Sequence, residues 1–385
     1  MAAPPTSSGS SSSGAPATLR LLHTSDLQLD APFTFLGEKG ATHRQQLRAT
    51  FRQIAELARQ GGYNLLLIAG DLFNDNRPSR TSLGLVQELL AALPIPVCIL
   101  PGNHDCYDRG SVYRREPFPA NVHILTETPS VVDFPELNLT VSGNAVLSRH
   151  STNGGLRGIN RHSDRRWHVA MAHGNVCVPG RIQDPERPIL PEEIAACGAD
   201  YVALGDWHAF ARKSQPAVAA FYCGAPEPTS MDASGSGYVA SITLSAQGVA
   251  VEPVRVGRTE TGRMCVDVTG RSEREIIGLI RQRAKPSLML DVVLRGLAAV
   301  DQVIDAERVA EEAAGGFYWL RVANQSHLEL AHLDPADYPE THVIGQYVRM
   351  LTQRIQTATD EAARTRAERA LQLGVALLRG QETLA

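Results

Sequence analysis

The chain has 385 residues, of which 43% are apolar and 20% charged, and its formal net charge is −4. This composition excludes a wholly disordered, collagen-like or coiled-coil protein. No apolar run reaches the roughly 18 residues that a membrane span requires, and the bulk charge gives no sign of nucleic-acid binding.

The N-terminal 17 residues are rich in Ser, Ala, Pro and Gly and lack the basic and apolar segments of a secretory signal. We expect residues 1–17 to be disordered. The six cysteines include no C-x-x-C pair, which favours reduced intracellular thiols over a disulfide frame or a zinc site. These features together predict a cytoplasmic protein without a membrane segment.

Short apolar runs alternate with helical segments over the first hundred residues. Strands are predicted at 18–23, 65–69 and 96–100, with helices at about 43–60 and 80–92 between them. Each apolar run ends in polar residues. This alternation predicts an α/β domain, in which the chemistry gathers at the carboxyl ends of the strands.

The pattern changes to short strands and turns over residues 121–172. Strands are predicted at 167–172 and 201–204, and each ends in polar residues that include histidine. Two more strand-like runs follow near 218–223 and 237–254.

A second unit is predicted after these strands. Ser272 and Glu275 form a capping box at the start of a helix that Pro286 ends. Residues 288–294 and 317–322 are predicted strands.

The C-terminal segment is predicted to be helical and carries two apolar stripes. One stripe comprises Ile344, Val348, Leu351 and Ile355, and the other Leu371, Val375 and Leu378. The stripes offer a docking place for a partner helix or a coiled-coil root. Packing on their own domain, or a homodimer, is the alternative.

These observations divide the chain into four segments. They are a tail at 1–17, a main domain at 18–257, a small α/β capping domain at 258–335 and a helical segment at 336–385.

Side chains of the kind that bind metals follow five predicted strands. They are Asp26 with Gln28, Asp71, Asn103 with His104, His173, and Asp206 with His208. Each one alone is explained more simply as a turn former or a structural residue. Five in succession point to a metal site, because carboxylates and imidazoles at one buried sheet edge would repel one another or stay desolvated without cations.

With this order of motifs, the chain resembles the calcineurin-like metallophosphoesterases. The motifs are Asp26-Leu27-Gln28, Gly70-Asp71, Gly102-Asn103-His104-Asp105, His173 and Gly205-Asp206-Trp207-His208. The segments LLHTSDLQLDAPF and IAGDLFNDN look most like the SbcD-type DNA repair exonuclease subunits. The resemblance covers about residues 18–256 and implies a four-layer sandwich of two mixed sheets flanked by helices.

The resemblance implies two divalent metal ions bridged by Asp71. One ion would be held by Asp26, His208 and Gln28, and the other by Asn103, His173 and Asp206. Two cations about 3.5–4 Å apart can hold a bridging hydroxide as the nucleophile. His104 lies outside both ligand sets and would be the general acid for the leaving alkoxide. Carboxylate, amide and imidazole ligands without thiolate favour Mn²⁺, with Fe and Mg²⁺ as alternatives.

Two ligand positions depart from the family pattern. Gln28 stands where the first motif usually has His, and Asp206 stands where the last motif usually has the first of its two His. Both exchange a nitrogen ligand for oxygen, which tilts the preference towards Mn²⁺ or Mg²⁺ and away from Zn²⁺. In the alternative, Asp206 turns away from the metals and caps a turn.

Residues 149–187 hold seven arginines against three acids. We interpret this run as a surface that tracks DNA phosphates, and a solvated loop is the simpler alternative. The candidate substrate-binding residues are Arg157, Arg161, Arg165 and Arg166. Trp207 is assigned either to stacking on a base or sugar, or to core packing beside the metals.

We therefore predict a two-metal phosphodiesterase, acting as a DNA exonuclease or endonuclease of DNA repair. The resemblance also implies an SbcC-like ATPase as a partner. One alternative is a phosphodiesterase or phosphatase for a small phosphoester, with the capping domain limiting access to the site. The other is a non-catalytic scaffold that binds a partner ATPase.

Overall fold

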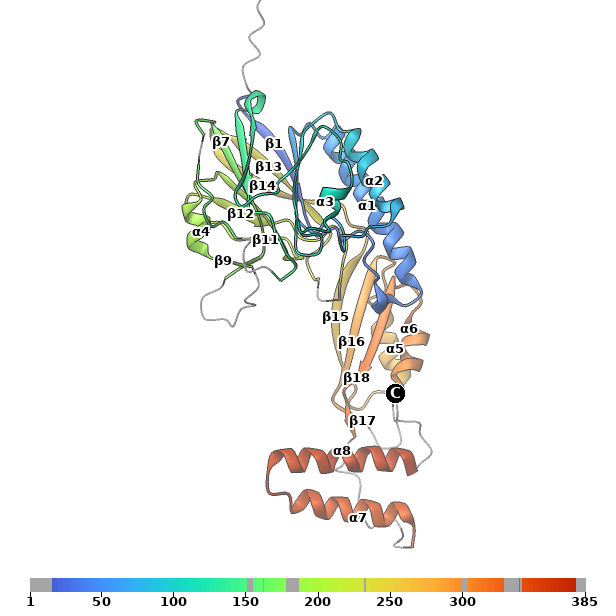
Figure 1. The fold of residues 1–385 in the computed structure, drawn as a ribbon. Helices are drawn as coiled ribbons and strands as arrows, with labels where there is room; N and C mark the ends of the chain where they lie inside the picture. The colour runs from blue at the N-terminus through green and yellow to red at the C-terminus, as the bar shows by residue number, and fades with distance from the viewer. Residues whose placement is uncertain are drawn as a thin grey trace, which may run out of the picture. The chain divides into compact units, whose positions relative to one another are not determined.

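The computed structural model describes residues 16–150, 155–161, 163–177, 187–231, 233–298, 304–328, 339 and 341–378 (Figure 1). The chain divides into two compact units, Met1–Glu260 and Thr261–Ala385. The tail predicted to be disordered lies outside the described residues, apart from its last two positions. Among the helices of the described ranges, none is both long and apolar enough to cross a bilayer.

The first unit contains a six-stranded mixed sheet. Its strands are β1 (Leu19–Thr24), β2 (Leu65–Ala69), β3 (Val97–Leu100), β4 (Val122–Ile124), β13 (Tyr238–Ser245) and β14 (Gly248–Arg255), in the order β14-β13-β1-β2-β3-β4. The strands from β1 to β4 are parallel, and β13 and β14 join antiparallel. The run predicted at 237–254 is therefore a hairpin of two strands.

A second six-stranded mixed sheet faces the first. Its strands are β5 (Ser130–Phe134), β6 (Leu139–Gly143), β7 (Trp167–His173), β10 (Tyr201–Gly205), β11 (Ala211–Arg212) and β12 (Ala219–Tyr222), in the order β11-β12-β10-β7-β6-β5. The four central strands are parallel, so their carboxyl ends lie at one edge. The predicted fold class is thus confirmed.

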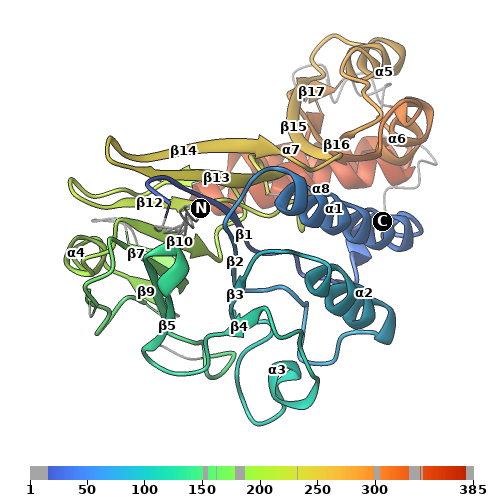
Figure 2. The ribbon, with the colours of Figure 1, turned by 90° about the horizontal axis from the view of Figure 1, so that it is seen from above.

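Helices cover the outer faces of the two sheets. The remaining elements of this unit are η1 (Thr34–Leu36), α1 (Lys39–Gln60), α2 (Arg80–Ala91), α3 (Val112–Arg115), η2 (Pro135–Leu137), β8 (Asn175–Val176), β9 (Pro188–Ile189) and α4 (Pro191–Ala196). Helices α1 and α2 lie side by side along the first sheet, and α4 lies beside the second (Figure 2). Helix α1 buries His43, Leu47, Phe51 and Ile54, because this spacing places them on one face.

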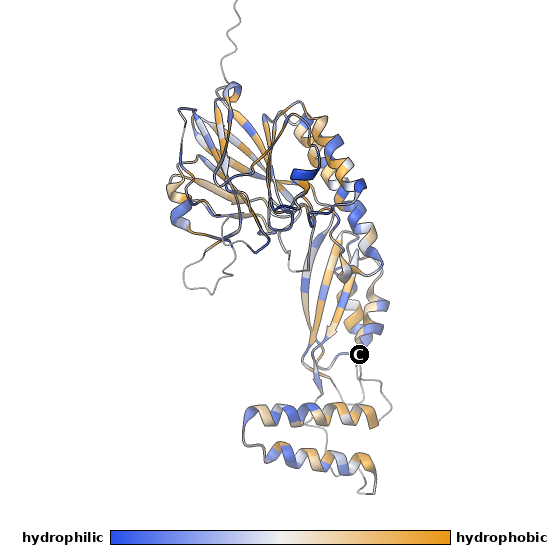
Figure 3. Ribbon diagram, viewed as in Figure 1, coloured by the Kyte–Doolittle hydropathy of each residue, from blue (hydrophilic) through white to orange (hydrophobic). Residues whose placement is uncertain are grey.

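The main core fills the space between the two sheets. It contains Leu65 and Leu67 of β2 together with Val169 and Met171 of β7. Their spacing of two residues places them on the same face of each strand. All five residues of β2 are buried, since helices cover its other face. Figure 3 shows the resulting concentration of apolar residues along the strands.

The second unit contains a three-stranded sheet of order β15-β16-β18. Its elements are β15 (Glu260–Asp267), α5 (Glu273–Arg281), β16 (Leu288–Arg295), β17 (Leu297–Ala298), α6 (Ala306–Ala313), β18 (Trp319–Asn324), β19 (His327–Leu328), α7 (Val343–Gln356) and α8 (Glu361–Leu378). The predicted capping box is confirmed, because the Ser272 side chain accepts a hydrogen bond from the Glu275 backbone N–H. Apolar residues of α5 and α6 form the core with this sheet.

Helices α7 and α8 pair as a hairpin. Val348 and Leu351 pack against Leu371 and Val375, so the two predicted stripes largely cover each other. The pairing corresponds to the alternative in which the stripes pack within the chain. Large apolar side chains that stay exposed on these helices are Val343, Met350, Leu373, Leu377 and Leu378.

Candidate metal centre

Five parallel strands deliver the predicted metal-binding side chains to one edge of the sandwich. In the first sheet, Asp26 follows β1, Asp71 follows β2 and Asn103 follows β3. In the second sheet, His173 ends β7 and Asp206 follows β10. The strands of each group are parallel, so their carboxyl ends meet at the same edge.

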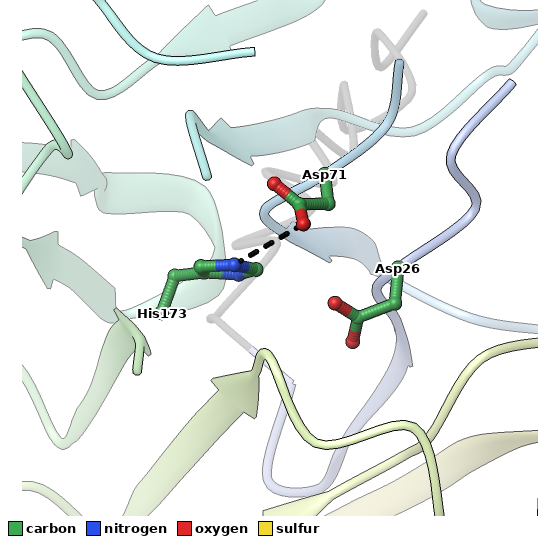
Figure 4. A group of neighbouring side chains, drawn as sticks. All are labelled: Asp26, Asp71 and His173. Carbon is green, nitrogen blue, oxygen red and sulfur yellow. Dashed lines mark ion pairs between the residues drawn. The ribbon is translucent and has the colours of Figure 1, made fainter. Parts of the chain in front are cut away.

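Asp26, Asp71 and His173 form the centre of this arrangement. One ligand atom from each lies within 4.8 Å of the other two, and all three side chains are buried. Figure 4 shows their polar groups turned towards one another, with an ion pair of 3.5 Å between His173 Nε2 and Asp71 Oδ2.

The backbone at this edge is left-handed at four non-glycine positions. The φ angles are 52° at Asp26, 43° at Gln28, 53° at Asp71 and 95° at Asp206. Such conformations cost on the order of 1–3 kcal/mol each, and they cluster at functional sites. Hydrogen bonds hold them here, since the Gln28 N–H donates to the Asp71 carbonyl at 2.8 Å.

Two glycines let the strand ends approach closely. A Cβ atom on Gly102 would lie 2.1 Å from Asp71 Oδ1, and one on Gly205 would lie 1.9 Å from the Ala69 carbonyl oxygen. A side chain at Gly102 would displace Asp71 within the first sheet, and a side chain at Gly205 would push the second sheet away from the end of β2 in the first. Gly102 and Gly205 are therefore part of the geometry of the centre.

The His173 ring has a defined orientation. Its Nδ1 is 2.9 Å from the Ala69 carbonyl and donates to it, which leaves Nε2 towards the centre. The oxygens facing Nε2 belong to Asn103 at 2.9 Å, Asp71 at 3.5 Å and Asp206 at 3.6 Å. Burial opposes the charged ring, but the carboxylates of Asp71, Asp206 and Asp26 together outweigh burial and raise the pKa of His173 to about 10. Acceptors on three sides define a place for a cation.

The two buried carboxylates have opposite pKa shifts. Burial raises the pKa of Asp26. Burial acts in the same direction on Asp71, but the charge and hydrogen bond of His173, together with those of His104, outweigh burial and hold the pKa of Asp71 well below its usual range. Buried anions need a compensating charge. The donor set, two carboxylates with an imidazole nitrogen and the Asn103 amide oxygen, fits a divalent cation that accepts oxygen and nitrogen ligands.

His208 and Gln28 lie at the margin of the cluster. His208 Nε2 is 3.9 Å from Asp26 Oδ1, and its Nδ1 is 2.7 Å from the Thr229 hydroxyl. Thr229 therefore orients this ring, although no sequence motif singles it out. The Gln28 side chain is buried, and its backbone bond to Asp71 places it at the same edge.

The Asp206 carboxylate faces His173 rather than turning away. Asn175 donates to its Oδ2 at 2.8 Å, and the Arg187 guanidinium lies 3.4 Å from its Oδ1. The Arg187 side chain is buried, with 5% of its surface exposed. The negative charge that Asp206 adds is thus offset by a buried cation. In the sequence, Arg187 is only one member of the basic run, so its role could not be singled out.

Removing the Arg187 charge should destabilise the fold. We expect Arg187→Met to lower the free energy of unfolding by about 3–5 kcal/mol, because it breaks a buried ion pair and leaves the largely buried Asp206 carboxylate with His173 as its remaining cationic neighbour. The double variant Arg187→Met with Asp206→Asn should recover most of this loss. Urea denaturation followed by circular dichroism measures both.

The matched control is Arg52→Met, at an exposed position of α1, which should change stability by less than about 0.5 kcal/mol. Equal losses in the single and double variants would show that Arg187 and Asp206 do not stabilise each other.

His104 lies beside the cluster with one ring nitrogen engaged. Its backbone N–H donates to Asp71 Oδ1 at 2.9 Å, and its Nδ1 donates to the Asn74 carbonyl at 2.9 Å. The ring is held through a backbone oxygen, which any residue at position 74 would supply. Nε2 is the atom left for proton transfer.

Asp105 holds the turn that carries His104. Its carboxylate accepts hydrogen bonds from the Gly102 N–H at 2.8 Å, the Phe73 N–H at 3.1 Å and the Tyr113 hydroxyl at 2.6 Å. Burial, together with the charge of Asp71, raises the pKa of Asp105 to about 6. This residue ties the turn after β3 to the turn after β2.

The four arginines predicted to track phosphates do not form one surface beside the centre. Three have structural partners, in the ion pairs Arg161–Asp200 (2.7 Å) and Arg165–Asp133 (3.0 Å) and in the stacking of Arg166 on Trp167. Arg165 and Arg166 precede the start of β7, and His173 ends it, about 20 Å away. Arg157 differs, because it is exposed and its carbonyl accepts from Asn144, just past the carboxyl end of β6. Residues 151–154, 162 and 178–186 of the basic run lie outside the described residues.

The part of the chain that contains the strands of the metal centre is similar to known proteins. Residues 19–210 match the sequence profile of the family described as calcineurin-like phosphoesterase. The matched range runs from β1 to the turn after β10, and it contains every predicted ligand.

Three curated relatives share 24% to 28% sequence identity with the chain. An uncharacterized metallophosphoesterase of Bacillus subtilis, YhaO, is 24% identical over 82% of this chain and 85% of its own. The DNA double-strand break repair protein Mre11 of Methanopyrus kandleri is 26% identical, over 54% of this chain and 49% of its own. The SbcD component of the nuclease SbcCD of Staphylococcus epidermidis is 28% identical, over 31% of this chain and 32% of its own. The chain thus spans about half of the second relative and a third of the third.

Proposed function

Since this chain belongs to the calcineurin-like phosphoesterase family, whose members are metal-dependent hydrolases, we propose that it is a phosphodiesterase acting on DNA. The observation that carries the proposal is the convergence of Asp26, Asp71 and His173 within 4.8 Å, with His104 next to them. Two relatives named for DNA break repair and for a nuclease support DNA as the substrate.

The proposed cofactor is a pair of divalent cations, with Mn²⁺ favoured by the oxygen and imidazole donors. Asp71 would contribute to both sites. Asp26, Gln28 and His208 would complete one ligand set, and Asn103, His173 and Asp206 the other. When bound, such cations activate water and neutralise charge on the phosphate.

The chain itself supplies the proton for the leaving group. His104 Nδ1 keeps its own hydrogen for the Asn74 carbonyl, so the proton that Nε2 would donate to the leaving alkoxide is the second proton of an imidazolium ring, which becomes the neutral Nδ1–H imidazole. General-acid catalysis of this kind contributes roughly 10²- to 10⁴-fold to a rate. Asp71 and Asp105 position this ring, because they hold the backbone of the turn that carries it.

The test is a hydrolysis assay on the full chain with Mn²⁺. The substrates are single-stranded and duplex linear DNA, a panel of nucleotides, and simple phosphodiesters. We expect cleavage of DNA, and its loss on chelation of the metal. If only the small substrates are hydrolysed, the proposed substrate is a small phosphoester and not DNA. Failure to hydrolyse any of them with metal bound would favour the scaffold interpretation.

We also propose an SbcC-type ATPase as the partner, docking on the α7–α8 hairpin. Deleting residues 340–385 should abolish co-purification with such an ATPase while activity on short DNA is retained. Met350→Glu with Leu377→Glu should have the same effect with the hairpin intact, because both side chains are exposed. Wild-type binding by both variants would place the docking site elsewhere.

A further inference from the structure

The turn after β10 carries an exposed indole between two of the proposed metal ligands. Trp207 is 50% exposed, although its neighbours Asp206 and His208 both face the cluster. Among the exposed large apolar side chains in the described ranges, it is the one aromatic residue. The prediction that Trp207 packs in the core is therefore wrong.

The backbone on both sides of Trp207 is fixed. The Asp206 N–H donates to the Asp26 carboxylate at 3.1 Å, and the His208 carbonyl accepts from the Ala225 N–H at 3.0 Å. The indole is thus carried by an anchored turn between two proposed ligands. A side chain held in this way needs little reorganisation to bind a ligand.

The indole is left without a partner in the described part of the chain. There, the Trp207 side chain makes no hydrogen bond, ion pair or ring contact. Exposing half of so large an apolar surface forgoes the hydrophobic stabilisation that its burial would give. An exposed indole on a fixed backbone, next in the chain to two residues of a proposed phosphate-binding centre, is suited to stacking on a flat ring of the substrate.

We propose that Trp207 stacks on a nucleobase of the bound DNA and that the site consequently prefers an unpaired base beside the scissile phosphate. This inference rests on the proposed function. Every base has a π face, so stacking on an aromatic side chain accepts any sequence. A base inside a duplex has both faces covered by its neighbours, so only single strands, frayed ends and terminal bases offer a free face.

The position of Trp207 also limits which base it contacts. Its Cα lies one residue, about 3.8 Å, from the Cα atoms of both Asp206 and His208. The indole therefore reaches the nucleotide whose phosphate occupies the centre or the adjacent one. The preferred substrate class is single-stranded DNA, or a duplex with an unpaired end.

The experiment compares single-stranded oligonucleotides that are identical except for one abasic residue, scanned along the strand. Trp207→Ala should lower kcat/KM on the intact strand by about 5- to 150-fold, mainly through KM. Trp207→Phe should retain most of the activity, because phenylalanine still stacks. On the strand whose abasic residue lies at the stacking position, the wild type should be impaired by a similar factor, and Trp207→Ala should add little to it.

A binding measurement separates this inference from the proposed function. Fluorescence anisotropy of the labelled intact and abasic strands in EDTA should show the same non-additive pattern without turnover. A Trp207→Ala loss of equal size on both strands would overturn the stacking proposal, even if DNA is cleaved. Absence of DNA cleavage by the wild type would overturn the proposed function, and the binding pattern would still decide the role of Trp207.

Discussion

His104→Ala is expected to lower turnover by about 10²- to 10⁴-fold while leaving the metal content of the protein unchanged. His104 contacts the cluster through its backbone N–H, which donates to Asp71. Its ring is held by the hydrogen bond from Nδ1 to the Asn74 carbonyl. Alanine retains the backbone donor, so the metal ligands should stay in place. The loss should fall on kcat, because Nε2 acts on the leaving group.

Elemental analysis and single-turnover kinetics on the same preparation measure the two effects. His123→Ala is the matched control, since this ring packs against Phe134 from β4 and serves no step of the proposed chemistry. Wild-type turnover in His104→Ala would remove the general-acid assignment. A fall in metal content would move His104 into the ligand set.

Asp71→Asn should lower the occupancy of both metal sites together and abolish most activity. The wild type is expected to bind about two ions per chain, in line with a two-metal centre. The asparagine carbonyl can still accept the His104 N–H, so the turn should keep its geometry. The variant removes one negative charge at the point where Asp26, His173 and Asn103 converge.

Isothermal titration with Mn²⁺, together with elemental analysis, tests this expectation. Asp133→Asn is the control, because it makes the same substitution in β5, outside the cluster. The Asp133 carboxylate pairs there with Arg165. One ion per wild-type chain would contradict the two-metal arrangement. Full occupancy in Asp71→Asn would show that Asp71 bridges nothing.

Local patterns in the sequence were sufficient to predict most of the helices and strands. The run at 65–69 is β2 without a change in either boundary, and the capping box at Ser272 does begin α5. Apolar periodicity and capping are properties of neighbouring residues, so they can be read along the chain. The cluster of Asp26, Asp71 and His173 could also be foreseen, because parallel strands bring their carboxyl ends to one edge.

Other features depend on segments that are distant in the sequence. Arg187 becomes the buried counter-ion of Asp206, whereas Arg161, from the same basic run, pairs with Asp200. The composition of the run does not predict which partner each arginine has, because charge alone does not tell which carboxylate a folded loop approaches.

The same limit applies to exposure. Trp207 and the two C-terminal stripes are all large apolar side chains in the sequence, but the indole is half exposed while Val348 and Leu371 are buried in one cluster. Burial is settled by what packs over a side chain, and that covering segment comes from elsewhere in the fold. Local motifs in the sequence thus identify the residues that carry the chemistry of the centre. Its charge balance, its exposed indole and the free surface of the C-terminal helices arise from long-range packing.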